Sequence, residues 1–283
     1  MFLVRNRRKP DKSLGDRLEW RCCRKSDTFA TVRKLLYETG DGIARLTLNR
    51  PDKRNALDAE LISELTSAVN ASAQDPSVRL VVLSGAGKDF CAGADLAALE
   101  RTLQNGILEN VSDARRLADL FTAMRNHPRP LVAAVRGRAL AGGCGLATAC
   151  DILLAAESAQ FGYPEVNIGF IPAMVMAILR RSVSEKAAFE LVATGEIISA
   201  GRAKELGVVQ RIYPDEGFED ETRAYVQKLA AKSGSALTLS KRLLYHIDAM
   251  PFDAALEAGV QANAIARMTA DCRQGIERFL KKD

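Results

Sequence analysis

LVAAVRGRALAGGCGLATACDILLAAESAQFGYPEVNIGFIP, residues 131–172, carries the strongest structural pattern in the chain. Its apolar run at 131–135 predicts a strand, its glycines at 137–145 predict a turn, and its small residues at 143–150 predict a helix. A strand, a glycine turn and a helix N-terminus in that order aim backbone N–H groups at a negative charge. Glu165 follows after a Gly-Tyr-Pro turn. The stretch therefore poses the question of whether backbone donors and one acid form a site.

Apolar runs and helical patterns alternate on both sides of this stretch. Runs at 35–38 and 42–48 flank a Thr-Gly-Asp turn and predict a β-hairpin, and the wholly apolar run at 80–83 predicts a strand buried on both faces. Asp58 is placed to cap a helix whose apolar residues recur at helical spacing, and another apolar run follows at 151–156. The alternation predicts parallel strands, arranged as a doubly wound sheet or as a stacked solenoid.

The pattern changes after Pro172, where the chain reads as mostly helical. Ser199 and Gly207 are placed to begin and end one of these helices. We expect helices at 178–193, 199–206, 218–232, 236–250, 252–269 and 271–282, with one short strand at 208–212. We therefore expect a core at 32–213 and a helical C-terminal region at 214–283, which packs on the core or on a neighbouring subunit.

Charge is distributed unevenly along the chain. Residues 1–35 hold 11 Lys or Arg and 4 acidic residues, whereas the other 248 residues hold 29 basic and 31 acidic groups. The basic excess therefore belongs to a leader at 1–31, which shows no hydrophobic periodicity and is expected to be disordered. The body of the chain has no basic character that would favour nucleic acid.

Composition also bears on compartment and cofactors. No apolar run approaches the roughly 20 residues that cross a bilayer, so we expect no membrane association and a cytoplasmic protein. The alternative is the mitochondrial matrix, if the leader is a transit peptide, although its acidic residues argue against that. Six scattered cysteines lack metal-ligand spacing and there are only two histidines, so we expect no metal.

Two short segments could supply backbone donors to a ligand. They are FCAGADL at 90–96 and LAGGCGL at 140–146, and their glycines allow close approach of the main chain. Such turns at strand–helix junctions are more often structural than catalytic. Neither segment alone identifies a function.

Taken together, four motifs resemble the crotonase (enoyl-CoA hydratase/isomerase) superfamily. They are LNRPDKRNAL, FCAGADL, the stretch from RGRALAGG to NIGFIP, and TGEIISAGRAKELGVVQRI, and the resemblance runs from about Val32 to the C-terminus. It implies an α/β fold, a crotonase-like spiral of ββα repeats with a helical C-terminal trimerisation region. It further implies a homotrimer or a dimer of trimers. The implied substrate is an acyl-CoA thioester of fatty acid metabolism, with coenzyme A entering as part of the substrate and no separate cofactor.

The resemblance assigns roles to individual residues. The two peptide N–H groups of the family's oxyanion hole fall on Ala94 and Gly142, with Gly143 flanking at the helix start. Glu165 matches the second of the two glutamates that hydratases of the family carry. The first falls on position 145, which is glycine in this chain. Glu165 would then act alone as general base and acid.

Three functions remain open on this resemblance. The first is an enoyl-CoA hydratase acting on a 2-enoyl-CoA, with a branched or carboxylated, methylglutaconyl-type acyl group as a variant suggested by Gly145, Glu165 and the Ile-Pro-Ala that follows. The second is a Δ3,Δ2-enoyl-CoA isomerase, in which Glu165 moves a proton and no water adds. The third is a non-catalytic acyl-CoA-binding or RNA-binding relative.

Some residues near these motifs are expected to be structural. Asp151 reads as structural, Cys144 and Cys150 read as packing thiols, and Asp95 is placed to cap a helix.

Further residues, with Asp95 among them, are predicted to bind the substrate. The resemblance implies that the nucleotide of coenzyme A lies along the segment of Arg54 and Ala56. It also implies that a neighbouring subunit offers Phe279 and Lys282 to that nucleotide. The alternative for these two residues is a solvated basic C-terminal tail. The substrate and CoA candidates are Arg54, Ala56, Ala92, Asp95, Leu96, Gly143, Phe279 and Lys282, and the acyl pocket is expected to be lined by Leu96, Leu99, Leu117, Leu120 and Met124.

Overall fold

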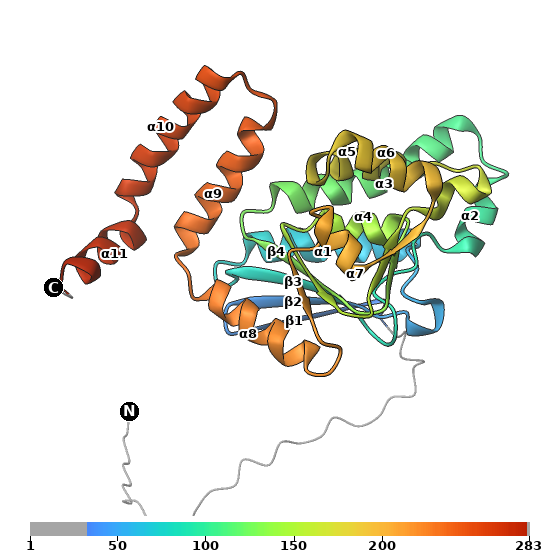
Figure 1. The fold of residues 1–283 in the computed structure, drawn as a ribbon, viewed down its shortest axis with the longest axis horizontal. Coiled ribbons are helices and arrows are strands. Elements are labelled where there is room, and N and C mark those ends of the chain that lie inside the picture. Colours follow the sequence, from blue (N-terminus) through green and yellow to red (C-terminus); the bar gives the residue numbers. More distant parts are fainter. Residues whose placement is uncertain (1–32, 282–283) are drawn as a thin grey trace, which may run out of the picture. The chain divides into compact units, whose positions relative to one another are not determined.

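The computed structural model describes residues 33–281 (Figure 1). It begins with an antiparallel hairpin of β1 (Leu35–Gly40) and β2 (Ile43–Leu48), as the sequence predicts. Asp41 and Gly42 join the strands with φ of 53° and 77°, a left-handed geometry that Asp and Gly adopt most readily. The predicted leader at 1–31 lies outside the described residues.

The main sheet grows from β2 in chain order. β3 (Leu80–Gly85), β4 (Leu131–Val135), β6 (Ile152–Ala156) and β9 (Arg211–Tyr213) add in parallel, giving the order β1-β2-β3-β4-β6-β9. A doubly wound sheet would reverse direction partway along this order. Because each new strand is added on the same side, the stacked arrangement is the one observed.

A second sheet is built from the strands between those of the first. It contains β5 (Arg138–Leu140), β7 (Gln160–Gly162) and β8 (Ile197–Ser199) in that order. β5 follows β4 and leads into α4 (Gly142–Thr148), whereas β7 follows β6 and leads into the 3-10 helix η2 (Pro164–Ile168). After β4 and again after β6, the chain thus visits the second sheet and then a helical segment before it returns to the main sheet.

Two long helices pack against each other and supply side chains to the core. α1 (Ala59–Gln74) is capped by Asp58, whose carboxylate accepts from the Leu61 N–H at 2.9 Å, as predicted. α3 (Ile107–Asn126) buries Leu120, Phe121 and Met124. Each fully buried aliphatic or aromatic side chain contributes about 1.5–3 kcal/mol through the hydrophobic effect.

The C-terminal part is helical, as the sequence predicts. Within residues 33–281 no helix is long and apolar enough to cross a membrane. The helices after Pro172 are α5 (Ala173–Ser182), α6 (Glu185–Thr194), α7 (Ala200–Glu205), α8 (Phe218–Ala230), α9 (Gly234–His246), α10 (Phe252–Met268) and α11 (Ala270–Leu280).

Two boundaries differ from the expected ones. The single helix expected at 178–193 is broken because Val183 is extended and Ser184 starts α6 by accepting from the Ala187 N–H. The strand expected at 208–212 begins only at Arg211. Val208 and Val209 instead donate their N–H groups to the Ala203 carbonyl and are buried after the end of α7.

A buried ion pair fastens α9 to the core. Lys241 Nζ lies 2.8 Å from Asp151 Oδ2, and Tyr245 donates to the other oxygen of the same carboxylate. Asp151 also accepts the Leu131 N–H at 2.7 Å, at the start of β4. Both charges are satisfied by several partners, which is what a buried pair requires. The structural role expected of Asp151 is confirmed.

Candidate active site

The site is built on one register across three parallel segments. Cys91 bridges to Ala139 in parallel, and Ala139 pairs with Phe161 in parallel. The Cys91 N–H donates to the Arg138 carbonyl at 3.0 Å, and the Cys91 carbonyl accepts from the Leu140 N–H at 2.9 Å. The three aligned side chains are fully buried. Because the segments are parallel, their carboxyl ends emerge at the same edge.

The three residues predicted to be catalytic all follow this register. Ala94 and Gly142 each lie three positions after their aligned residue, and Glu165 lies four positions after Phe161. The carboxyl ends of parallel strands are where ligand sites form in such sheets. The fold therefore brings segments more than 70 positions apart in sequence to one edge.

The Ala94 N–H is left free by its neighbours' hydrogen bonds. The Leu57 N–H donates to the Gly93 carbonyl at 2.7 Å, and the Leu57 carbonyl accepts from the Asp95 N–H at 2.9 Å. In a parallel bridge, the residue between two such bonds turns its own N–H to the opposite side. Within residues 33–281, no protein acceptor takes this N–H.

The Gly142 N–H opens a helix, and among the described residues no acceptor takes it. The first N–H groups of α4 have no acceptor within the helix. Ala141, just before it, has φ 50° and ψ −128°, a conformation that costs a non-glycine residue about 1–3 kcal/mol. Its own N–H donates to the Gly162 carbonyl at 2.8 Å, which holds the strained turn in place. Alanine carries no sequence signal for this geometry, so sequence reasoning missed it.

Gly143 explains how closely α4 approaches the first donor turn. A Cβ on Gly143 would lie 2.3 Å from the Cys91 carbonyl oxygen. A Cβ on Gly93 would lie 2.8 Å from the Ala141 Cβ and 3.6 Å from the Gly142 nitrogen. The two donor turns are therefore in direct contact, and glycine at both positions is what allows it.

Glu165 presents a buried acid with an unused oxygen. It is 8% exposed, and its Oε2 has no hydrogen-bond partner among the described residues. Burial raises its pKa above the ordinary 4.5 because the charged form is desolvated. A carboxylate of this kind is a stronger base than a solvated one, so it suits proton transfer.

A buried polar cluster links the Glu165 segment to α4. The Tyr163 hydroxyl lies 3.2 Å from Thr148 Oγ1, and Thr148 donates to the Cys144 carbonyl at 2.8 Å. Burial raises the pKa of the Cys144 thiol to about 11 and that of Cys91 to about 12, and it raises the pKa of Cys150 as well. Burial thus favours the protonated thiols, which agrees with the packing role predicted for Cys144 and Cys150.

The segment predicted to follow the nucleotide lies against the first donor turn. Leu57 bridges to Ala94, and the Ala92 N–H donates to the Arg54 carbonyl at 3.0 Å. The Arg54 side chain is 63% exposed, whereas Ala56 is buried. The Arg54 Nε lies 4.0 Å from Asp89 Oδ2, and the rest of this exposed guanidinium is accessible to a ligand.

Arg50 and Asn55 are structural residues of the site that sequence reasoning missed. Asn55 is fully buried with φ 57°, and its amide donates to the carbonyls of Ala86 at 2.9 Å and Asp89 at 2.8 Å. Arg50 donates to the Ala56 carbonyl and to Asp95. Their only signal was their place in the LNRPDKRNAL motif.

The Asp95 carboxylate accepts three hydrogen bonds from within the protein. Its Oδ1 caps α2 (Leu96–Thr102) by accepting the N–H groups of Ala97 and Ala98, and its Oδ2 accepts from Arg50 at 2.8 Å. The predicted helix cap is confirmed.

The remaining predicted residues fall into separate environments. Leu120 and Met124 are fully buried in the main core, so the expectation that they line an open acyl pocket is wrong. Leu96 is 76% exposed, and Leu99 and Leu117 are half-buried. Phe279 is exposed on α11, and Lys282 lies outside the described residues.

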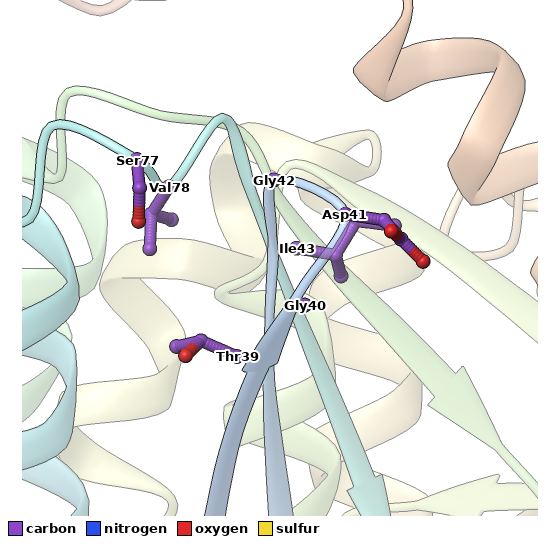
Figure 2. A pocket seen from close by; sticks show the side chains of 7 residues that line it. All are labelled: Thr39, Gly40, Asp41, Gly42, Ile43, Ser77 and Val78. Carbon is purple, nitrogen blue, oxygen red and sulfur yellow. The ribbon is translucent and has the colours of Figure 1, made fainter. Parts of the chain in front are cut away.

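One small cavity lies elsewhere in the fold. It has a volume of about 170 Å³ and surrounds the β1–β2 turn at the amino ends of β2 and β3 (Figure 2). Its lining residues are Thr39, Gly40, Asp41, Gly42, Ile43, Ser77 and Val78. Because the donor turns lie at carboxyl ends, this cavity is not part of the candidate site.

Known proteins resemble this chain along most of its length. The family model described as enoyl-CoA hydratase/isomerase matches residues 38–283. A Thermus thermophilus protein whose name includes enoyl-CoA hydratase is 43% identical over 240 residues, 85% of this chain and 95% of its own. The 2,3-dehydroadipyl-CoA hydratase of Escherichia coli is 33% identical over 252 residues, 89% and 97% of the two chains. A crystal structure of a Mycobacterium smegmatis enoyl-CoA hydratase has a TM-score of 0.84 at 35% identity, covering 88% of this chain and 96% of that one. These likenesses confirm the predicted fold class.

The raised pKa of Glu165 has a consequence for stability. A carboxyl group whose pKa is higher in the folded state than in the unfolded state favours folding while protonated, and this contribution is lost as the pH rises above 4.5 through the raised value. We expect the free energy of unfolding of the wild type, relative to Glu165→Gln, to fall across the pH range above 4.5. Urea titrations of both proteins measure this, with exposed Glu157→Gln as the control. A constant difference across that range would contradict the buried-acid assignment.

Proposed function

The chain belongs to the enoyl-CoA hydratase/isomerase family, and on that premise we propose that it adds water across the double bond of a 2-enoyl-CoA thioester. The observation that carries the proposal is the unpartnered, buried Oε2 of Glu165. Glu165 comes shortly after the aligned residues Cys91, Ala139 and Phe161, as do Ala94 and Gly142 with their free N–H groups. This combination supplies a base and two donors without any other ionisable group.

In the proposed reaction, the thioester oxygen accepts hydrogen bonds from the Ala94 and Gly142 N–H groups. Glu165 removes a proton from water as the water oxygen bonds to C3, and negative charge moves onto the thioester oxygen. The protonated Glu165 then returns a proton to C2, so one water is added on one face. Donors fixed where charge develops stabilise such a transition state, and one of them is typically worth about 3–4 kcal/mol.

The substrate assignment has two parts. For coenzyme A we propose the Arg54 segment, because it lies directly against the Ala94 turn and the Arg54 side chain is exposed. For the acyl group we propose a branched or carboxylated chain. The name of the E. coli relative, 2,3-dehydroadipyl-CoA hydratase, describes a carboxylated enoyl group and supports this choice.

A second candidate reaction is isomerisation of a 3-enoyl-CoA. Position 145 carries glycine, so no second carboxylate stands beside Glu165 on α4. In this reaction Glu165 takes the proton from C2, the two N–H groups hold the dienolate, and the same proton is returned to C4. The geometry supports this candidate because a single acid is sufficient for it.

The chemical assignment is tested by turnover and product mass. Incubation with a 2-enoyl-CoA should give a product heavier by one water, whereas isomerisation of a 3-enoyl-CoA leaves the mass unchanged. We expect Glu165→Gln to lower kcat by about 10²–10⁴-fold. In the pH profile of the wild-type kcat, we expect the acidic limb to have its midpoint above pH 4.5. Glu157→Gln, an exposed change eight positions earlier, should leave kcat unaltered. Full turnover by Glu165→Gln would rule out the mechanism.

We also propose that the protein acts as a homotrimer or a dimer of trimers. Helices α10 and α11 leave many large apolar side chains exposed, more than monomers usually carry in one region. They are Phe252, Leu256, Val260, Ile265, Met268, Ile276, Phe279 and Leu280. In such an assembly, Phe279 would be the residue offered to a neighbour's nucleotide.

Light scattering measures this assembly. We expect a mass three or six times that of the 30.7 kDa chain. The double change Leu256→Glu and Val260→Glu, one helical turn apart on α10, should shift the protein toward monomer. A wild-type mass of 30.7 kDa would contradict the proposal.

A further inference from the structure

Two adjacent residues before the candidate acid hold the two ends of α4. The Gly162 carbonyl accepts the Ala141 N–H at 2.8 Å, immediately before α4 begins at Gly142. The Tyr163 hydroxyl lies 3.2 Å from Oγ1 of Thr148, the last residue of α4. One attachment point would leave a short rigid helix able to pivot, whereas two points at opposite ends fix its direction.

The Tyr163 hydroxyl is the donor in this second attachment. Thr148 has a single hydroxyl proton, which it donates to the Cys144 carbonyl at 2.8 Å. The Thr148 oxygen therefore accepts the proton of Tyr163. Burial raises the pKa of Tyr163 well above its usual range, so the phenol keeps that proton. Tyr163 is 2% and Thr148 8% exposed, so bulk water competes little for the bond.

The composition of α4 makes this bond important for the direction of the helix. Its sequence, GGCGLAT, contains three glycines and one large apolar side chain, Leu146. A helix of small residues has few side-chain atoms to interlock with its neighbours, so fixed polar contacts contribute more to its alignment. Because helical N–H groups run parallel to the axis, the direction of α4 is also the direction of the Gly142 N–H.

The same bond restrains the segment that carries the acid. Tyr163 immediately precedes η2, and Pro164 opens η2 with a φ angle that its ring restrains. Glu165 follows directly, so its backbone is only two residues from the Tyr163 attachment. The bond between Tyr163 and Thr148 therefore connects the acid to the helix of one N–H donor through the core.

We propose that Tyr163 is a positioning residue, whose hydroxyl bond to Thr148 sets the alignment of Glu165 with the Gly142 N–H. The inference rests on the proposed function, in which Glu165 is the acid. It applies to hydration and to isomerisation alike, because both candidate reactions use the same acid and the same donors. Tyr163 acts through the groups that it aligns and not by contact with the substrate. Its loss should therefore slow the chemical step and leave substrate binding nearly unchanged.

The alignment is tested by removing single hydroxyl groups. Tyr163→Phe leaves Thr148 bonded to the Cys144 carbonyl. With crotonyl-CoA for hydration and 3-hexenoyl-CoA for isomerisation, we expect Tyr163→Phe to lower kcat about tenfold and to change KM less than twofold, because misaligned reacting groups lose rate. Wild-type kcat in Tyr163→Phe, or a loss confined to KM, would overturn the proposal.

The partner hydroxyl provides a double-mutant cycle and a rescue. Thr148→Val should lower kcat as Tyr163→Phe does, and the double variant should lose no more than the larger single loss, because both changes remove one bond. Thr148→Ser keeps the hydroxyl, so we expect it to retain kcat close to that of the wild type. Losses that multiply in the double variant would contradict action through this bond.

Tyr245→Phe is the matched control for stability. It also removes a tyrosine hydroxyl from a bond inside the fold, the one donated to Asp151 where α9 meets the core. A bond to a charged acceptor contributes more to stability than one between neutral groups. We expect Tyr245→Phe to lower Tm at least as much as Tyr163→Phe while its kcat stays unaltered. A parallel fall of kcat in both variants would overturn the positioning role.

Failure of the proposed function has a different signature, which is full turnover by Glu165→Gln. The bond itself is then still measured by Tm, without any activity. Thr148→Val leaves a buried phenol without its acceptor, whereas the double change with Tyr163→Phe removes both polar groups. We expect the double variant to have a higher Tm than Thr148→Val alone. A Tm lowered by the sum of the two single losses would show that the hydroxyls are not joined.

Discussion

The alignment of Cys91, Ala139 and Phe161 is the constraint on which the rest of the site depends. It fixes three parallel segments at one level, so that the residues three or four positions later emerge at one edge. A shift of one residue in either pairing would reverse the side to which the following N–H points. The stacked order of strands provides this alignment because each turn of the chain repeats the path of the one before.

Local strain and desolvation accompany this arrangement. Ala141 is held in an unfavourable backbone conformation by its bond to Gly162, and that conformation directs the Gly142 N–H. Glu165 is buried with one oxygen unpaired, which destabilises its charged form and raises its pKa. Both features cost stability, and both create the reactivity that a solvated carboxylate and a relaxed turn would lack.

Much of the fold could be predicted from sequence because local signals agreed with the tertiary structure. The Thr-Gly-Asp turn predicted the hairpin, and Asp58 predicted the helix cap. The apolar run at 80–83 predicted the buried strand. The sequence pattern could not choose between a doubly wound and a stacked sheet, since strand order is set by long-range packing. Ala141 was missed for a related reason: alanine as a residue type does not signal backbone strain until its neighbours are in place.

The contact between the two donor turns can be probed at Gly93. An alanine there would place its Cβ 2.8 Å from that of Ala141 and push the Ala94 turn away from Gly142. Gly217 also has positive φ but nothing within 4 Å of a Cβ, so Gly217→Ala tests the effect of an alanine at positive φ without a steric clash. The account predicts that Gly93→Ala, still folded, loses about a hundredfold in kcat/KM, while Gly217→Ala loses none. Equal activity in the two variants would contradict a donor pair built on this register.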